Sequence, residues 1–208
     1  MRGSKGEVVR RVVMLGPPAS GKGTQGRRLA TVLGIPHVST GHLLRRTMEA
    51  GDPFGVQQFV VRGQRVPDRV VEAVLRPALG PGFLLDGYPR TGRQAGRLDE
   101  ILGLRGVSVE VAVELQVEEE TLCARMMLRA EAEKRSDDRP DVFFHRLDDY
   151  RSHAPAIREH YAQRLVAVPA SDGSQDEVFA RTMNALAARL PGLGARLPAA
   201  ATGLPAPA

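Results

Sequence analysis

The sequence predicts an α/β protein in which a five-stranded parallel sheet is covered by helices on both faces. Short apolar segments rich in β-branched residues alternate along the chain with segments of helical periodicity, and this alternation is typical of parallel sheets with crossover helices. Hydrophobic residues make up 42% and charged residues 25% of the 208 residues, as in average globular chains. This length allows one sizeable core with small appendages, so we expect a single domain.

The N-terminal segment predicts a strand, a loop and a helix in succession. Residues 8–15 are β-branched and apolar, which indicates a strand, and they lead directly into a loop of glycine and proline. After Gly23, apolar residues recur on one helical face until Gly34, a typical helix stop. Residues 35–38 should form a short second strand.

The next segment predicts small helices. Ser39 and Thr40 are plausible N-caps for a helix whose apolar residues follow directly. Further small helices should fill residues 54–79, with breaks at Gly63 and Pro67.

Two further strands are expected in the middle of the chain. Residues 83–85 form an apolar run that ends at Asp86, which indicates a strand buried on both faces. Residues 107–117 place apolar residues at odd positions, with Glu110 and Glu114 among the polar residues between them. A period of two predicts a strand, and the polar positions suggest that one of its faces contacts water.

The C-terminal part completes the α/β pattern. We expect helices at residues 118–130 and 141–164, the fifth strand at residues 165–168 and a closing helix at residues 175–190. Residues 191–208 are almost entirely proline, glycine, alanine and leucine with little charge, so we expect a disordered tail.

Composition argues against several classes of protein. The lone cysteine, Cys123, excludes an internal disulfide and a multi-cysteine zinc site, which agrees with a reducing compartment. No apolar run approaches the ~20 residues that cross a bilayer, and the N-terminus lacks the apolar stretch of a signal peptide. We therefore expect a cytoplasmic protein without a membrane partner. The net charge of +5 comes from dispersed arginines, without a basic tail, so we expect no nucleic-acid partner.

A glycine-rich loop carries the strongest functional signal. Residues 16–22 (GPPASGK) fit the pattern G-x-x-x-x-G-K between an expected strand and an expected helix. In such a loop, backbone N–H groups surround a phosphate, the helix N-terminus adds partial positive charge, and Lys22 reaches the outer phosphates. An incidental turn is the alternative, which the flanking strand and helix disfavour. Gly23 follows the lysine, so the hydroxyl that usually binds the metal is displaced to Thr24.

The segment 16–25 (GPPASGKGTQ) resembles the nucleoside monophosphate kinases, and among these the adenylate kinase family. Four further motifs occur in the same order as in that family: residues 39–41 with Arg45, residues 66–68, residues 83–91 with Gln94, and residues 135–138 with Arg146. The resemblance spans about residues 10–190, which makes an accidental match implausible.

The resemblance implies a three-layer fold of the P-loop NTPase type, with a single kinase domain over residues 1–190. Within it we expect an AMP-binding helical insertion at about residues 39–68 and a short lid at about residues 126–138. The implied reaction is reversible, Mg²⁺-dependent transfer of a phosphoryl group from ATP to AMP, which gives two ADP and serves adenine nucleotide homeostasis. The expected ligands are ATP, AMP and ADP, and the expected state is a monomer.

Phosphoryl transfer depends on positioning and on positive charge around the transferred group. The resemblance implies that the catalytic residues are Lys22, Arg90, Arg125, Arg129, Arg135 and Arg146. It implies ATP contacts from Ala19, Ser20, Gly21, Lys22, Gly23, Thr24, Arg125, Arg129 and Gln175. Arg125 and Arg129 are four residues apart, so they share one face of a helix.

The acceptor nucleotide is expected on the other side of the cleft. The implied AMP contacts are Thr40, Arg45, Gln64, Arg65, Val66, Gly87, Tyr88, Pro89, Arg90, Gln94, Arg135 and Arg146. Relatives that act on UMP or CMP typically carry alanine at the position of Thr40, so threonine favours AMP. A role for Thr40 as an N-cap alone is the alternative, and the two roles are compatible. Gln94 is placed as the amide that contacts the adenine edge.

Asp86 resembles the acid that holds Mg²⁺ through water, and capping of the following turn is its alternative role. One position departs from the family: His42 stands where an aspartate is usual after Ser-Thr-Gly. A carboxylate near the metal is thereby replaced by a group that is neutral or cationic near pH 7, which bears on Mg²⁺ affinity and turnover.

Two alternatives stay open from the sequence. A kinase for another nucleoside monophosphate is one, and Thr40 and Gln94 count against it. A nucleotide-binding sensor with weakened catalysis is the other, and the intact Lys22 and arginines count against that.

Overall fold

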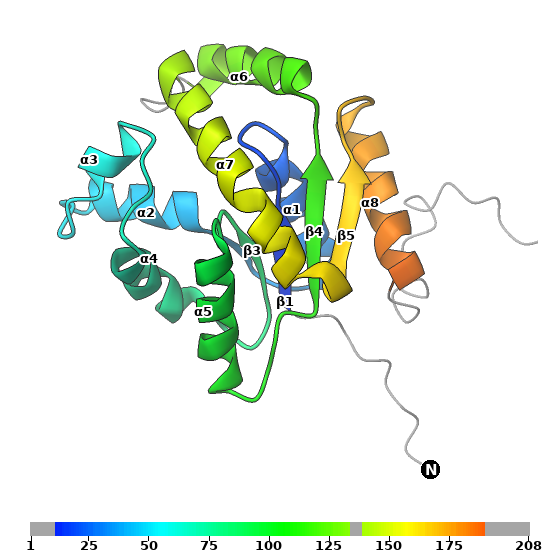
Figure 1. The fold of residues 1–208 in the computed structure, drawn as a ribbon, viewed down its shortest axis with the longest axis horizontal. Coiled ribbons are helices and arrows are strands. Elements are labelled where there is room, and N and C mark those ends of the chain that lie inside the picture. Colours follow the sequence, from blue (N-terminus) through cyan, green and yellow to red (C-terminus); the bar gives the residue numbers. More distant parts are fainter. Residues whose placement is uncertain (1–10, 134–138, 190–208) are drawn as a thin grey trace, which may run out of the picture.

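The computed structural model describes residues 11–133 and 139–189 and contains a five-stranded, all-parallel sheet (Figure 1). The strand order is β2-β3-β1-β4-β5. The strands are β1 (Arg11–Leu15), β2 (His37–Ser39), β3 (Phe83–Asp86), β4 (Val111–Gln116) and β5 (Leu165–Pro169). The predicted α/β class and parallel sheet are confirmed.

Helices enclose the sheet on both faces. In chain order they are α1 (Lys22–Leu33), α2 (Thr40–Glu49), α3 (Gln57–Val60), α4 (Asp68–Leu75), the 3₁₀ turn η1 (Arg76–Ala78), α5 (Gly92–Gly103), α6 (Glu119–Glu133), α7 (Pro140–His160), the 3₁₀ turn η2 (Ala162–Arg164) and α8 (Gln175–Arg189). Among the residues described, no helix is both long enough and apolar enough to cross a membrane.

Alternate residues of the central strand enter two separate apolar cores. Val12 packs in a cluster with residues of α1 and α8, whereas Val13 packs in a cluster with residues of α4, α5 and α7. Both side chains are fully buried. Successive side chains of a strand point to opposite faces, so burial of both requires helices on both sides of the sheet.

The observed bounds of β1 and β2 differ slightly from the predicted ones. The described part of β1 begins at Arg11, and residues 8–10 of the predicted strand lie outside the described residues. The second strand begins at His37 and not at Ile35. The reason is local, because the N–H of Ile35 donates to the carbonyl oxygen of Ala30 and closes the end of α1 after Gly34, whose φ is +67°.

The fourth strand corrects a prediction. We expected one face of residues 107–117 to contact water, but β4 lies between β1 and β5 and is buried from Val111 to Leu115. Glu114 is 1% exposed. Its carboxylate faces Tyr150 and Arg158 of α7, so the polar alternation marks a buried contact with a helix.

Helices form in the predicted segments, and two of these segments contain more than one helical element. Residues 54–79 hold α3, α4 and η1, and the predicted helix 141–164 is divided into α7 and η2. The helices α2, α3 and α4 gather at one side of the sheet (Figure 1), where the AMP-binding insertion at 39–68 is predicted. The predicted lid at 126–138 falls partly within α6 and partly outside the described residues, and the predicted tail at 191–208 lies entirely outside them. These domain assignments stay predictions.

Candidate active site

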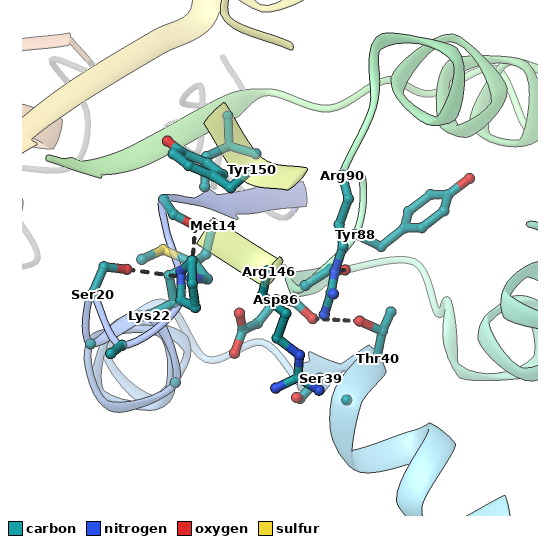
Figure 2. Close-up of a pocket in the computed structure, with 18 of the residues that line it drawn as sticks. Met14, Ser20, Lys22, Ser39, Thr40, Asp86, Tyr88, Arg90, Arg146 and Tyr150 are labelled. Carbon is teal, nitrogen blue, oxygen red and sulfur yellow. Dashed lines mark hydrogen bonds between the residues drawn. The ribbon is translucent and has the colours of Figure 1, made fainter. Parts of the chain in front are cut away.

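A cleft of about 1110 Å³ lies at the carboxyl ends of the strands. Its walls come from the loop after β1, the start of α2, the loop after β3, and α7 (Figure 2). In open parallel sheets this edge is the usual position of a ligand site, because strand order reverses there and leaves a crevice.

The loop between β1 and α1 adopts backbone conformations that favour glycine. Gly16 has φ +138°, and a Cβ there would lie 2.8 Å from the carbonyl oxygen of Leu115. Gly21 has φ +92° and precedes α1, and Ala19 also has a positive φ of 61°. A loop with such conformations can direct backbone N–H groups into a concave anion site at the N-terminus of a helix.

Lys22 begins α1, and its side chain folds back over this loop. Its Nζ donates to the carbonyl oxygens of Gly16 at 2.8 Å and Pro17 at 2.6 Å, and it lies 3.3 Å from the Oγ of Ser20. The ammonium group is therefore held at the rim of the loop, where it can exchange carbonyl oxygens for phosphate oxygens.

Three arginines from separate segments converge on the cleft: Arg90 after β3, Arg146 on α7 and Arg65 before α4. In the view of Figure 2 the side chains of Arg90 and Arg146 lie between Lys22 and Thr40. Arg90 and Arg146 therefore place positive charge between the glycine-rich loop and α2.

Burial and the neighbouring charges both act on the pKa of Arg90. Desolvation in the cleft lowers the pKa of Arg90, and the charges of Arg146 and Arg65 lower that pKa further, whereas Asp86 and Asp149 raise it. Arginine stays charged at any physiological pH. A bound anion would add to the compensation that these two carboxylates give Arg90.

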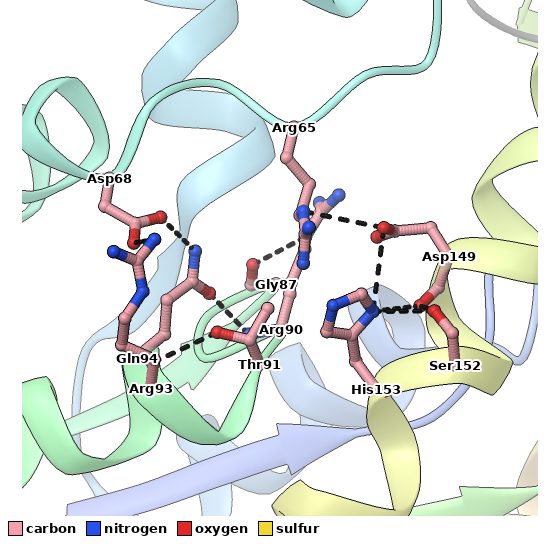
Figure 3. Close-up of polar contacts among 10 residues, drawn as sticks. All are labelled: Arg65, Asp68, Gly87, Arg90, Thr91, Arg93, Gln94, Asp149, Ser152 and His153. Atoms are coloured by element: carbon pink, nitrogen blue, oxygen red, sulfur yellow. Dashed lines mark hydrogen bonds and ion pairs between the residues drawn. The ribbon is translucent and has the colours of Figure 1, made fainter.

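Contacts with other residues of the cleft fix the directions of two of these arginines (Figure 3). The Nε of Arg90 donates to the carbonyl oxygen of Gly87 at 2.9 Å. The Nε of Arg65 lies 3.5 Å from the Oδ1 of Asp149, on α7. This ion pair connects the segment before α4 to α7 across the cleft.

The side of the cleft near α6 and α8 contains further predicted residues. Arg125 donates to the carbonyl oxygen of Ala170 at 2.8 Å, and burial lowers the pKa of its guanidinium. Gln175 starts α8 and lines the cleft, and its carbonyl oxygen accepts hydrogen bonds from Gln25 at 2.9 Å and Arg28 at 3.0 Å. These contacts tie α8 to α1 beside the glycine-rich loop.

Thr40 begins α2 at the opposite side of the cleft and is buried. Its hydroxyl donates to the carbonyl oxygen of Asp86 at 3.1 Å. Gly87 has φ +85°, and a Cβ there would lie 2.6 Å from the Oγ1 of Thr40. The glycine thus permits β3 and α2 to approach. Ser39 and not Thr40 is the N-cap, because the N–H of His42 donates to the Oγ of Ser39.

Gln94 is buried in the first turn of α5 and lines the cleft. Its Oε1 accepts a hydrogen bond from the backbone N–H of Arg90 at 2.6 Å, and its Nε2 donates to the Oδ1 of Asp68 at 2.8 Å. The N–H of Gln94 itself donates to Thr91, the N-cap of α5, at 3.1 Å. The side-chain amide is therefore held on both sides.

Asp86 ends β3 in the floor of the cleft and fits a hydrated Mg²⁺ ion. Burial alone would raise the pKa of Asp86, but His37, whose Nε2 lies 3.7 Å from the Oδ2, and the charges of Lys22 and Arg90 together lower it, so the group is a carboxylate. A Cβ on Gly23 would lie 3.6 Å from its Oδ2, so this oxygen lies close to the start of α1. Mg²⁺ is typically held by one or two carboxylates, several waters and substrate phosphates. Within the described ranges, no three His, Cys, Asp or Glu side chains form a closed metal site, which agrees with such a sparse donor set.

Most of the predicted site residues line this one cleft. They are Ala19, Ser20, Gly21, Lys22, Gly23, Thr24, Thr40, Arg45, Gln64, Arg65, Val66, Asp86, Gly87, Tyr88, Pro89, Arg90, Gln94, Arg125, Arg146 and Gln175. The side chain of Arg129, on α6, and all of Arg135 lie outside the described residues. His42 also lines the cleft, with an exposed side chain.

Sequence reasoning missed a buried polar network that borders the cleft. The carboxylate of Glu114 accepts hydrogen bonds from Tyr150 at 2.7 Å and from the Nε of Arg158 at 2.9 Å. All three residues line the cleft. An acidic residue within an otherwise apolar strand was the available signal, because a strand enclosed by helices has no solvent for a charge to contact.

The sequence is similar to those of known proteins over most of its length. Residues 14–166 match the family model described as adenylate kinase. A protein named adenylate kinase from Mycobacterium bovis (strain BCG / Pasteur 1173P2) is 41% identical over 183 residues, which cover 85% of this chain and 98% of the relative. An adenylate kinase from Xanthomonas euvesicatoria pv. vesicatoria is 43% identical over 184 residues, which cover 85% of this chain and 98% of the relative. One from Thermobifida fusca is 41% identical over 187 residues, which cover 86% of this chain and 99% of the relative.

Proposed function

The chain belongs to the adenylate kinase family, and from that premise we propose a residue-level account of how it transfers a phosphoryl group from ATP to AMP. The enzyme is a nucleoside monophosphate kinase, and the reaction is reversible and gives two ADP. One observation carries the account: the glycine-rich loop with Lys22 and the pocket that contains Thr40 and Gln94 line the same cleft, with Arg90 and Arg146 lining it as well.

ATP occupies the side of the glycine-rich loop. Residues 19–24 surround its phosphates through backbone N–H groups, and Lys22 contacts the outer phosphates. Arg125 and Gln175 border this half of the cleft. Arg129 and Arg135, which match the family's motif, complete the phosphate contacts from the lid.

AMP occupies the side of α2 and α5. Arg45, Arg90 and Arg146 bind its phosphate, while Thr40, Gln94 and the backbone of residues 64–66 surround its base. Gly87, Tyr88 and Pro89 form the wall of this half, and Arg65 contributes positive charge. Thr40 and Gln94 support AMP over other monophosphates, because hydrogen-bonding groups in a buried pocket reject bases that leave them unpaired.

The protein's contribution to the transfer is alignment and charge. Arg90 and Arg146 lie where the phosphates of two nucleotides would meet, so they hold donor and acceptor in line and stabilise the negative charge of the transition state. Asp86 would hold Mg²⁺ through water, and a bound Mg²⁺ supplies neutralising charge to the phosphate oxygens. The presence of Lys22, Arg90 and Arg146 in the cleft supports catalysis over a sensor role.

The setting of the enzyme is also part of the proposal. Both halves of the cleft come from one chain, which supports a monomer. A single cysteine supports a reducing, cytoplasmic compartment. The dispersal of the arginines among acidic residues supports small anionic ligands over nucleic acid.

One assay tests the function directly. Purified protein is incubated with ATP, Mg²⁺ and AMP, GMP, CMP or UMP in turn, and ADP production is followed by a coupled reaction. We expect rapid ADP production with AMP and much slower production with the others. Chelation of Mg²⁺ should abolish the rate, and Lys22→Ala gives the background. Absence of ADP production with AMP would overturn the proposal, and a preference for CMP or UMP would reassign the acceptor.

A further inference from the structure

The side-chain amide of Gln94 has two fixed partners whose hydrogen-bonding roles cannot change. The carboxylate of Asp68 can only accept hydrogen bonds, so it must face the NH₂ of the amide, 2.8 Å away. The backbone N–H of Arg90 can only donate, so it must face the Oε1, 2.6 Å away. Rotation of the amide by 180° would place its NH₂ against the N–H of Arg90, two donors together, and its Oε1 against the carboxylate of Asp68, two acceptors together.

Asp68 begins a helix and has one further, exposed partner. It is the first residue of α4, and its Oδ2 lies 2.6 Å from the guanidinium of Arg93 (Figure 3). Gln94 is 4% exposed and is the third residue of α5, behind the N-cap Thr91. Two helix N-termini therefore fix the amide from both sides.

The fixed amide leaves one N–H and one lone pair of Oε1 for a ligand. A 6-amino purine presents an amino donor at C6 and an acceptor at N1, which complement this pair. A 6-oxo purine presents an acceptor at C6 and a donor at N1, which complement the amide only in its rotated state. The orientation of Gln94 therefore distinguishes the two classes of base.

We propose that Asp68 is a specificity-determining positioning residue, which fixes the amide of Gln94 in the orientation that accepts 6-amino purines and rejects 6-oxo purines. This inference rests on the proposed function, in which Gln94 contacts the acceptor base. Asp68 lies in the Val-Pro-Asp segment, residues 66–68, to which the proposed reaction gives no other role for the aspartate. It acts through Gln94 and does not touch the reacting atoms.

A purely structural role for Asp68 would be to join α4 to α5. The structure supplies a matched comparison, because a second ion pair joins the same helices. The Nε of Arg97 on α5 donates to the Oε2 of Glu72 on α4 at 3.1 Å. The hydrogen bonds described for Gln94 involve Arg90, Thr91 and Asp68, and neither Arg97 nor Glu72.

The test compares AMP with IMP, which differs from AMP only at C6 and N1 and has no 2-amino group. The variant Asp68→Asn keeps the shape of the side chain but can present either an acceptor or a donor to Gln94. We expect the ratio of kcat/KM for AMP to kcat/KM for IMP to fall by about tenfold or more. The change should appear mainly in KM, because Asp68 orients the base and does not stabilise the transferred phosphoryl group.

Two controls separate orientation from helix packing. Glu72→Gln removes the other link between α4 and α5, and Arg93→Ala removes the exposed partner of Asp68 while keeping the carboxylate. Both variants should retain the wild-type ratio and the wild-type rate with AMP, whatever they do to the melting temperature. A fall in the ratio in Glu72→Gln equal to that in Asp68→Asn would overturn the proposal, since it would assign the effect to helix packing.

The remaining outcomes are also decisive. A wild-type protein that phosphorylates AMP, combined with an unchanged ratio in Asp68→Asn, overturns the inference and leaves the proposed function standing. A wild-type protein that does not phosphorylate AMP overturns the proposed function itself. If Asp68→Asn fails to fold, Asp68→Ser replaces it, because a hydroxyl likewise donates or accepts, and the same fall in the ratio is expected.

Discussion

The Nε of Arg158, on α7, lies 2.9 Å from the Oε1 of Glu114, a buried carboxylate on β4, the strand between β1 and β5. Tyr150, two helical turns earlier, donates to the same oxygen at 2.7 Å. Glu114 therefore anchors α7 to the sheet at two points. Arg146 lies one turn before Tyr150, so this anchor also fixes the direction from which a cleft arginine reaches the phosphates.

This pair predicts an asymmetry between two substitutions. Arg158→Ala leaves a buried carboxylate with only Tyr150 as partner and should cost about 3 kcal/mol of unfolding free energy. Glu114→Gln leaves a half-exposed arginine that water can reach. The amide oxygen of the new glutamine can still accept the hydrogen bond from Tyr150, so the loss of unfolding free energy should be about 1 kcal/mol. Urea unfolding of both variants measures the difference. Equal costs would show that Glu114 is hydrated and not anchored.

Lys22→Ala should abolish phosphoryl transfer while the protein stays folded. Its ammonium donates to carbonyl oxygens of the glycine-rich loop and belongs to none of the apolar cores, and it supplies charge to phosphates that no other loop residue replaces. We expect a fall in kcat of about 10³-fold, with a melting temperature close to that of the wild type. The coupled assay and thermal unfolding report the two quantities. An unchanged rate would contradict the assignment of the ATP side.

Thr40→Ala should relax acceptor choice toward pyrimidine monophosphates. The substitution removes a buried hydroxyl that donates to the carbonyl oxygen of Asp86, and it opens space beside Gly87 at the base pocket. Thr40→Ser keeps the hydroxyl and serves as the control. The quantity to measure is the ratio of kcat/KM for AMP to that for CMP, which should fall in the alanine variant and persist in the serine variant. An identical ratio in all three proteins would leave Thr40 with a structural role alone.

The start of α8 predicts a dependence of stability on pH. The backbone N–H of Ser174 donates to the Oε2 of Glu177 at 2.6 Å, and the N–H of Glu177 lies 3.2 Å from the Oγ of Ser174, which is a reciprocal capping box. The hydrogen bond from the Ser174 backbone, followed by that of its side chain, lowers the pKa of Glu177. A carboxyl whose pKa is lower in the folded state stabilises the protein at neutral pH and loses that effect as pH falls through the folded pKa.

The comparison is between wild type and Glu177→Gln. Wild type should be the more stable at pH 7, and the difference should shrink as the pH falls from about 5 to about 3. Chemical unfolding at a series of pH values measures it. A difference of the same size at pH 7 and pH 3 would mean that the charge of Glu177 has no part in the cap.

Local signals account for the parts of the fold and site that the sequence predicted. The strand, loop and helix around Lys22 depend on glycine conformations and apolar periodicity within a short segment, and both are visible in one pass along the chain. The end of α1 was placed correctly because Gly34 adopts the positive φ that a helix stop favours. The predicted bounds of β2 were less accurate, because residues after Gly34 still complete the end of α1 before the strand begins.

Contacts between distant residues account for what the sequence did not predict. The partners of Glu114 lie 36 and 44 residues further along the chain. The partner of the Gln94 amide lies 26 residues earlier. An acidic residue in an otherwise apolar strand indicates that a partner is needed, but no local pattern identifies which distant residue that partner is.

The convergence of Arg65, Arg90 and Arg146 favours nucleotide binding at a cost in the stability of the protein without nucleotide. Like charges held in one cleft repel one another, and a bound anion adds to the compensation that Asp86 and Asp149 already give Arg90, as is common when a site is arranged for its ligand and not for packing. A nucleotide that binds only the folded chain adds about 2.7 kcal/mol when its free concentration is a hundred times its Kd. The protein should therefore resist unfolding and proteolysis longer when its own substrates are plentiful. When nucleotides are scarce, the enzyme without bound nucleotide should be degraded faster.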